Sequence, residues 1–128
     1  MRLLLDTHTL LWSSHEPQRL SMRVSALLCD TNNELYISLA SCWEIAIKLS
    51  LGKLRLGKPL DHLIADEVTV NGSKLLPIEL RHIMAGSRLP FHHRDPFDRL
   101  LVAQALTEDM PIVTVDGQLA PYGVTVIW

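Results

Sequence analysis

The sequence contains little cysteine and no long apolar run, and each shortage excludes a class of protein. Cys29 and Cys42 are its only cysteines and do not form a CxxC spacing, which argues against a cysteine metal or redox motif. We expect two buried thiols in a reducing cytoplasm. No stretch approaches the 18 apolar residues of a membrane span, and Asp6 interrupts the N-terminal apolar run. We therefore expect a cytoplasmic protein that is neither secreted nor inserted in a membrane.

A strong excess of positive charge is also lacking. The chain has 12 lysines and arginines against 14 acidic residues, a net charge of -2. This balance excludes nucleic-acid binding through bulk positive charge, although it allows a local basic patch. With 128 residues, 48% of them apolar, and no repeat or linker, the chain fits a single globular domain over residues 1–128.

Short apolar runs alternate with helical patterns along the chain. Strands are predicted at residues 2–5, 34–38, 74–78, 111–115 and 124–128. Helices are predicted at residues 7–14, 20–30, 38–52, 59–68, 79–88 and 95–110. The alternation indicates an α/β fold, in which a mostly parallel sheet is covered by helices on both faces.

Two carboxylates follow predicted strands. Asp6 ends the run RLLL, and Asp116 follows PIVTV. Ligands of parallel sheets bind at the carboxyl ends of strands, where the strand order reverses, so the two acids could share one crevice. Each also has a purely structural explanation, because Asp is a favoured N-cap and Asp116–Gly117 is a common turn pair.

Two further acids lie in predicted helices. Glu44 is surrounded by apolar residues, where a charge is seldom buried without a partner. If the helix begins at Ser41, Glu44 completes a capping box; if Ser38 is the N-cap, Glu44 lies inside the helix and can face the crevice. Asp98 falls in the first turn of the helix after Asp95-Pro96, where an acid favours the helix dipole by about 0.3–1 kcal/mol.

Four clustered carboxylates would repel one another unless a cation compensates their charge. Oxygen ligands without a cysteine or compact histidine set suit Mg²⁺ or Mn²⁺. Such an ion activates water and stabilises charge on a phosphoryl group. The chemistry indicated is metal-assisted phosphodiester hydrolysis.

Four segments carry a family resemblance: LLLDTHTLLW, ISLASCWEIAIK, HHRDPFDRLLVAQAL and IVTVDGQL. In this order they resemble the PIN-domain ribonucleases, and more narrowly the VapC toxins of bacterial and archaeal toxin–antitoxin pairs. DPFDRLLVAQA is the most distinctive part, and the resemblance covers nearly the whole chain. It implies a three-layer α/β/α sandwich with four or five strands, and a metal site that hydrolyses RNA to a 5′-phosphate and a 3′-hydroxyl.

The resemblance also assigns residues. Asp6, Glu44, Asp98 and Asp116 are the expected catalytic and metal-binding acids. Thr7 and Thr114 occupy family hydroxyl positions that hydrogen-bond a carboxylate or a metal-bound water. Asp95 is assigned to capping, with a supporting role near the metal left open. After Asp116 the chain reads GQLAPYGVTVIW, which departs from the commoner pattern and leaves the local backbone and a second metal site open.

Partners follow from the same resemblance. It implies a homodimer and a small VapB-like antitoxin whose C-terminal segment lies in a groove near the acids. The apolar helices within residues 38–70 are candidates for that groove and for a dimer face, with ordinary core packing as the alternative.

The candidates for contact with RNA phosphates are Arg94 and Arg99 first, then Arg88, Lys48 and Lys53, with His92 and His93 on the same loop as Arg94. Two adjacent histidines are more typical of a solvent-facing loop than of a metal site. Trp12 and Trp43 could stack on bases, although core or interface packing is the commoner role of tryptophan.

Other classes fit the sequence less well. A haloacid-dehalogenase-like phosphatase needs a DxD pair, and the residues here are DTH. A receiver domain needs a late lysine, and none follows Lys74. The alternative that stays open is a catalytically inactive PIN-like module that binds RNA or protein.

Overall fold

A central parallel sheet organises the molecule. The structure, a computed structural model, describes all 128 residues. Its strands are β1 (Arg2–Leu5), β2 (Glu34–Ser38), β3 (Lys74–Leu76), β4 (Ile112–Val113) and β5 (Val126–Ile127). They lie in the order β3-β2-β1-β4-β5, and every pairing is parallel. The predicted α/β fold with a parallel sheet is confirmed, and the sheet has five strands.

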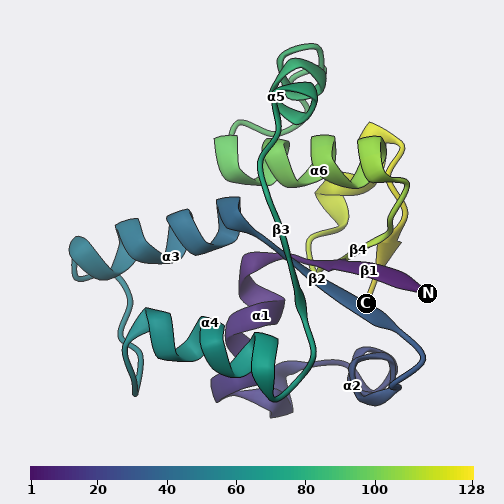
Figure 1. Cartoon of the computed structure of the whole chain (residues 1–128). Helices are drawn as coiled ribbons and strands as arrows, with labels where there is room; N and C mark the ends of the chain where they lie inside the picture. Colours follow the sequence, from purple (N-terminus) through teal and green to yellow (C-terminus); the bar gives the residue numbers. More distant parts are fainter.

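Helices cover both faces of this sheet. They are α1 (Thr7–His15), α2 (Met22–Cys29), α3 (Leu39–Ser50), α4 (Leu60–Thr69), α5 (Leu80–Ser87) and α6 (Pro96–Glu108), with the 3-10 helices η1 (Pro17–Arg19) and η2 (Gly117–Tyr122). Figure 1 shows α5 and α6 above the sheet, α1, α2 and α4 below it, and α3 beside it. The molecule is therefore the three-layer sandwich that the sequence predicts. None of its helices combines the length and apolar composition that crossing a membrane requires.

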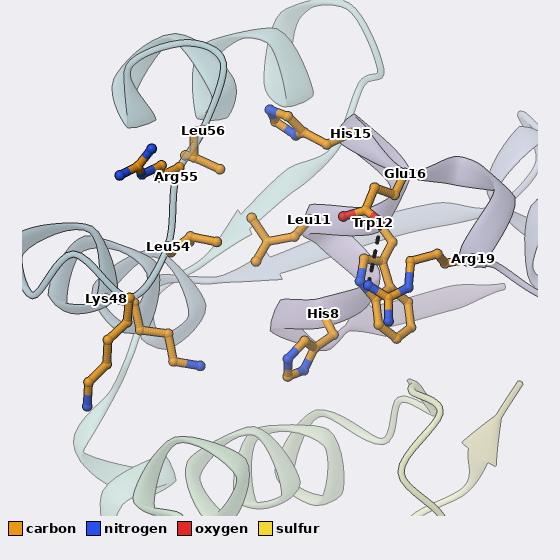
Figure 2. A pocket seen from close by; sticks show the side chains of 11 residues that line it. His8, Leu11, Trp12, His15, Glu16, Arg19, Lys48, Leu54, Arg55 and Leu56 are labelled. Carbon is orange, nitrogen blue, oxygen red and sulfur yellow. Dashed lines mark hydrogen bonds and ion pairs between the residues drawn. The ribbon is translucent and has the colours of Figure 1, made fainter.

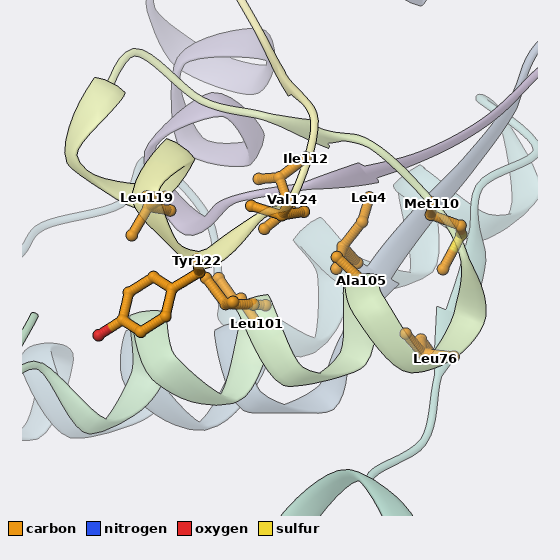
Figure 3. Packing of buried hydrophobic residues seen from close by; sticks show 10 residues of the cluster. Leu4, Leu76, Leu101, Ala105, Met110, Ile112, Leu119, Tyr122 and Val124 are labelled. Carbon is orange, nitrogen blue, oxygen red and sulfur yellow. The ribbon is translucent and has the colours of Figure 1, made fainter. Parts of the chain in front are cut away.

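The core explains why β1 is apolar throughout. Leu4 packs with Leu101 and Ile112 in the cluster under α6, whereas Leu3 and Leu5 pack with Val24 of α2 on the opposite face. Figure 3 shows the first of these clusters, in which α6 lies along the sheet. A strand buried on both faces needs apolar residues at every position rather than at alternate ones.

Helix boundaries settle the choice left open for Glu44. Ser38 is the N-cap of α3 and its hydroxyl accepts a hydrogen bond from the Ala40 N–H. The capping-box alternative with Ser41 is therefore wrong, and Glu44 lies in the second turn of the helix. The end of α3 is as predicted, because Gly52 follows the last turn with a φ of 70°, a conformation that glycine adopts without strain.

The two cysteines differ from the expectation of buried thiols. Cys29 is exposed and Cys42 is only partly buried. Cys29 is the last residue of α2, whose buried residue is Val24, five positions earlier in the chain. Partial burial raises the pKa of the Cys42 thiol, which disfavours the reactive thiolate.

The strand order reverses between β1 and β4. The chain winds outward from β1 through β2 to β3, then returns to β4 on the other side of β1. Asp6 follows β1 and Asp116 lies beyond β4, so the two acids flank the switch point at which parallel sheets bind ligands.

Candidate metal centre

Asp6 has both of the roles proposed for it. Its Oδ1 accepts a hydrogen bond of 2.7 Å from the Thr9 N–H and so caps α1. Its Oδ2 accepts a hydrogen bond of 2.5 Å from the Thr114 hydroxyl. The residue is only 6% exposed. Asp6 can therefore cap α1 and also face the other acids, because each role uses a different oxygen of its carboxylate.

Thr114 joins the two acids that follow strands. Besides donating to Asp6, its hydroxyl oxygen accepts a hydrogen bond of 3.0 Å from the Asp116 N–H. Asp116 in turn caps η2, since its Oδ1 accepts from the Gln118 N–H at 2.9 Å. Through these two hydrogen bonds Thr114 holds the backbone of Asp116 close to the carboxylate of Asp6.

Glu44 is buried and held at both carboxylate oxygens. Its Oε1 accepts from the Thr7 hydroxyl at 2.7 Å, and its Oε2 lies 2.8 Å from the Lys48 ammonium one turn later. The Ser41 hydroxyl lies 3.0 Å from that of Thr7. Both threonines singled out in the sequence therefore contact carboxylates of the candidate site.

His93 lies at the acidic centre, although the sequence named it only beside Arg94 as a candidate for phosphate contact. Its Nε2 lies 3.5 Å from Asp98 Oδ2 and 3.4 Å from Asp116 Oδ2. Its Nδ1 accepts a hydrogen bond of 3.1 Å from the Asp95 N–H, so the ring proton of the neutral imidazole is on Nε2, facing the two acids. The expectation that His93 faces solvent is wrong, and nothing in the pair His92–His93 distinguishes the inward residue.

The environment of Asp98 shows that the acids converge. Its pKa is raised from 3.8 to about 6, mainly because burial penalises the charged form. The charges of Asp95, Glu44 and Asp6 raise this pKa further, and His93 lowers it. Acids from β1, α3 and α6 therefore lie close to one another, and Asp116 joins them through His93 and Thr114.

Asp95 is a helix cap. Its Oδ1 accepts from the Phe97 N–H at 2.8 Å and from the Asp98 N–H at 3.1 Å. This contact orients the first turn of α6 and hence Asp98. The capping role assigned from the sequence is confirmed.

The donor set of this centre fits a hard divalent cation. It consists of carboxylate oxygens held on rigid elements, as Mg²⁺ and Mn²⁺ prefer. In the structure, the Lys48 ammonium compensates the charge of Glu44, and the His93 Nε2–H lies between Asp98 and Asp116. Asp98, Asp116 and His93 each offer a ligand atom within 4.8 Å of the others.

The sequence profile of the PIN domain family matches residues 3–123. The chain belongs to this family. Ribonuclease VapC22 of Mycobacterium tuberculosis is 33% identical over 120 residues, which cover 91% of this PIN domain and 88% of that protein.

Solved structures show the same fold. VapBC2 of Rickettsia felis, bound to a DNA fragment from its promoter, matches this PIN domain with a TM-score of 0.73 at 12% identity, covering 99% of this chain and 98% of that one. VapBC-5 of Mycobacterium tuberculosis, a member of the VapBC family of toxin–antitoxin systems, matches with a TM-score of 0.63 at 16% identity, covering 98% and 97% of the two chains.

The guanidinium of Arg99 is not free to contact an RNA phosphate. Its guanidinium donates hydrogen bonds to the carbonyl oxygens of Gly86, Leu89 and Pro90, and it stacks on Phe91. The prediction that Arg99 contacts phosphate is therefore replaced by a structural role, bracing the loop that carries His93. Arg94 is exposed and makes no hydrogen bond or ion pair, so it stays a candidate for contact with phosphate.

The segment after Asp116, where the PIN domain departs from the commoner pattern, also supports His93. It forms η2, and the Tyr122 hydroxyl accepts a hydrogen bond of 2.7 Å from the His93 N–H. Of the two packing roles favoured for the tryptophans, core and interface, the core does not hold: Trp43 is 61% exposed, and Trp12 is half-buried beneath the Arg19 guanidinium.

Proposed function

We propose that this PIN domain is a metal-dependent endoribonuclease toxin. The observation that carries the proposal is the convergence of Asp6, Glu44 and Asp98, which raises the pKa of Asp98 to about 6 together with its burial, and the link from Asp98 through His93 to Asp116. A buried acidic cluster of this kind is stable in its ionised form only with a cation. The ribonuclease name of the VapC22 relative supports RNA as the substrate class.

The four acids would hold Mg²⁺ or Mn²⁺. A bound ion supplies an activated water and neutralises charge on the phosphodiester. Thr7 and Thr114 keep Glu44 and Asp6 in place by hydrogen bonds. His93 directs its Nε2 proton to the edge of the same centre, where it can donate to a phosphate oxygen.

The same proposal includes a protein partner. VapBC-5 is described as a member of a family of toxin–antitoxin systems, which supports a small VapB-like antitoxin for this chain. A cationic side chain of such a partner could neutralise the acids as the Lys48 ammonium does at Glu44 in the structure. A second copy of the chain is proposed to pack on the apolar surface formed by Leu39, Trp43, Val68 and Leu75.

Cleavage of labelled RNA tests the activity. Wild type and Asp6→Asn are purified in parallel and assayed with Mg²⁺, with Mn²⁺ and with a chelator. We expect metal-dependent cutting by wild type, with a 5′-phosphate on the product, and none by the variant. Equal cutting by both proteins indicates a contaminating nuclease and removes the support.

The open alternative, an inactive module, makes a different prediction. Neither protein would cut any of several RNAs. Titration of Mn²⁺ by calorimetry then decides whether the acids bind metal: binding by wild type but not by Asp6→Asn would retain the metal site, and the absence of binding would reject it.

A further inference from the structure

A pocket of about 330 Å³ opens beside the acidic centre. One wall comes from α1 and η1, and the other from the end of α3 and the segment that follows it. Figure 2 shows these two walls facing each other, with Leu11 and Leu54 between them. The volume lies within the range of pockets that hold small ligands or parts of larger ones.

Cations dominate the lining of this pocket. They are Arg19, Lys48, Lys53 and Arg55, against the single carboxylate of Glu16, and the imidazoles of His8 and His15 lie beside them. Four of the 12 lysines and arginines of a chain with net charge -2 therefore gather at one place. Such a concentration favours an anionic ligand.

The wall formed by α1 consists of residues spaced three and four positions apart. His8, Trp12 and His15 are four and three residues apart, so they lie on one face of α1. Arg19 extends this face, with its guanidinium 4.5 Å from the centre of the Trp12 ring. An indole with an arginine stacked on it is a combination that single-stranded nucleic acid uses for contact.

In the opposite wall, residues 53–56 alternate between exposed cations and apolar side chains that pack on the core. Leu54 and Leu56 pack on the cluster of Leu10, Ile37, Ile45 and Leu63, and Figure 2 shows both pointing toward α1. The residues between and before them, Lys53 and Arg55, are exposed and form no ion pair. The apolar anchors thus hold two uncompensated cations at the pocket and its rim.

The pocket begins where the acidic centre ends. Lys48 lines the pocket and its ammonium lies 2.8 Å from Glu44. His8 directly follows Thr7, whose hydroxyl donates to the same glutamate. A polyanion with one phosphate at the acidic centre would place its next phosphates along this wall.

We propose that this pocket binds the sugar–phosphate backbone of single-stranded RNA next to the phosphodiester that is cut. The inference rests on the proposed function and adds the site that positions its substrate. Lys53 and Arg19 bind phosphates from the two walls, and Trp12 provides an apolar surface for the adjoining sugar or base.

Binding of a fluorescein-labelled, unstructured RNA, measured by anisotropy in chelator, tests this site without cleavage. Lys53→Ala and Arg19→Ala should each weaken binding several-fold and reduce the slope of log K against log salt by roughly 0.7. Arg23→Ala is the matched control for Lys53→Ala, because Arg23 is exposed on α2, outside the pocket, and like Lys53 makes no ion pair, whereas Arg19 pairs with Glu16 at 3.5 Å. It should bind as wild type does.

Equal weakening by all three variants, or none by Lys53→Ala and Arg19→Ala, would overturn the proposal. So would a Lys53→Ala protein that loses binding of a polyglutamate peptide but keeps its affinity for RNA, because the pocket would then be a protein site. Wild type that binds RNA through Lys53 without cutting it refutes the nuclease alone. Cutting by wild type with unchanged RNA affinity of Lys53→Ala refutes the pocket alone.

Discussion

At the scale of single residues, the candidate site is built from side chains that perform a structural and a chemical task together. Asp6 caps α1 with one oxygen and turns the other to Thr114. Asp95 caps α6 and presents its charge to Asp98. A carboxylate already fixed by a cap needs little reorganisation to hold a ligand, which is the rigidity that a metal site requires.

Thr114 provides the sharpest residue-scale prediction. It is fully buried, and its hydroxyl joins Asp6 to the backbone of Asp116. Thr114→Val keeps the shape but leaves buried polar groups unpaired, at a cost of about 1–3 kcal/mol. We expect a lower free energy of unfolding in urea and loss of RNA cleavage, whereas Thr114→Ser should retain both. A valine variant with wild-type cleavage would show that this link is dispensable.

Asp98 predicts how stability depends on pH without metal. Because its pKa is about 6 in the folded protein and about 3.8 in the unfolded chain, the folded state binds more protons between these values. The contribution of Asp98 to stability is therefore fully present below pH 3.8 and is lost as pH rises through 6. Chemical denaturation at several pH values measures this, after a discount for the partial exposure of Asp98.

Asp98→Asn is the control for that measurement, because an amide does not titrate. The difference in unfolding free energy between variant and wild type should grow from pH 4 to 6 in favour of the variant, then level off. Mn²⁺ should stabilise wild type increasingly over the same interval, since the ion requires the ionised carboxylate. Parallel pH profiles of the two proteins would contradict the assignment.

At the scale of elements, helix termini place the acids. Ser38, the last residue of β2, caps α3, so that Glu44 reaches the crevice from the second turn of the helix. Asp95 caps α6, so that Asp98 lies in its first turn. Two helices from different parts of the chain thus direct acids to the same edge of the sheet.

The N-terminus of α6 gives a prediction of its own. Asp95→Ala removes the acceptor for two backbone N–H groups and should destabilise the protein by about 0.5–2 kcal/mol, whereas Asp95→Asn keeps a cap of similar strength. Thermal unfolding of the two variants compares them. If Asp95→Asn is stable but cleaves RNA poorly, the charge of Asp95 contributes to the metal centre; if it cleaves normally, capping is its whole role.

Local patterns predicted most elements and the four acids, since apolar runs, caps and Asp-Pro are signals carried by neighbouring residues. Contacts distant in sequence could not be predicted in this way. β4 and β5 are two residues each, shorter than their apolar runs, and η2 occupies a segment for which no helix was predicted. The inward turn of His93 depends on Tyr122, and the role of Arg99 depends on carbonyls up to 13 positions away.

At the scale of the whole molecule, an apolar surface contrasts with the charged pocket on α1. Leu39 and Trp43 lie one turn apart on α3, next to an apolar groove of about 730 Å³ that includes Ile64, Val68 and Leu75. Exposed patches of this kind mark interaction surfaces. We assign one proposed partner to each surface: RNA to the charged pocket, and a second copy of the chain to the apolar surface.

Sedimentation of the isolated protein tests whether the apolar surface is a dimer interface. We expect a dimer at micromolar concentration and a monomer for Trp43→Asp, because a charge would be buried without a partner in the interface. Phe91→Asp is the control, since Phe91 is 82% exposed against 61% for Trp43, but lies on the loop near the acids rather than on this surface. A wild-type monomer, or equal effects of both variants, would contradict the proposed dimer face.

The reversal of strand order also determines when the acids can meet during synthesis. Asp6 and Thr114 are 108 positions apart, yet they are hydrogen-bonded across the switch between β1 and β4. A ribosome adds about 5–20 residues per second, so roughly 5–20 seconds pass between the two. During that interval the nascent chain carries Asp6, and later Glu44, but lacks Thr114 and Asp116. An enzyme that cuts RNA would thus emerge from its own messenger and ribosome without a complete centre, and would become active only after the last strands dock.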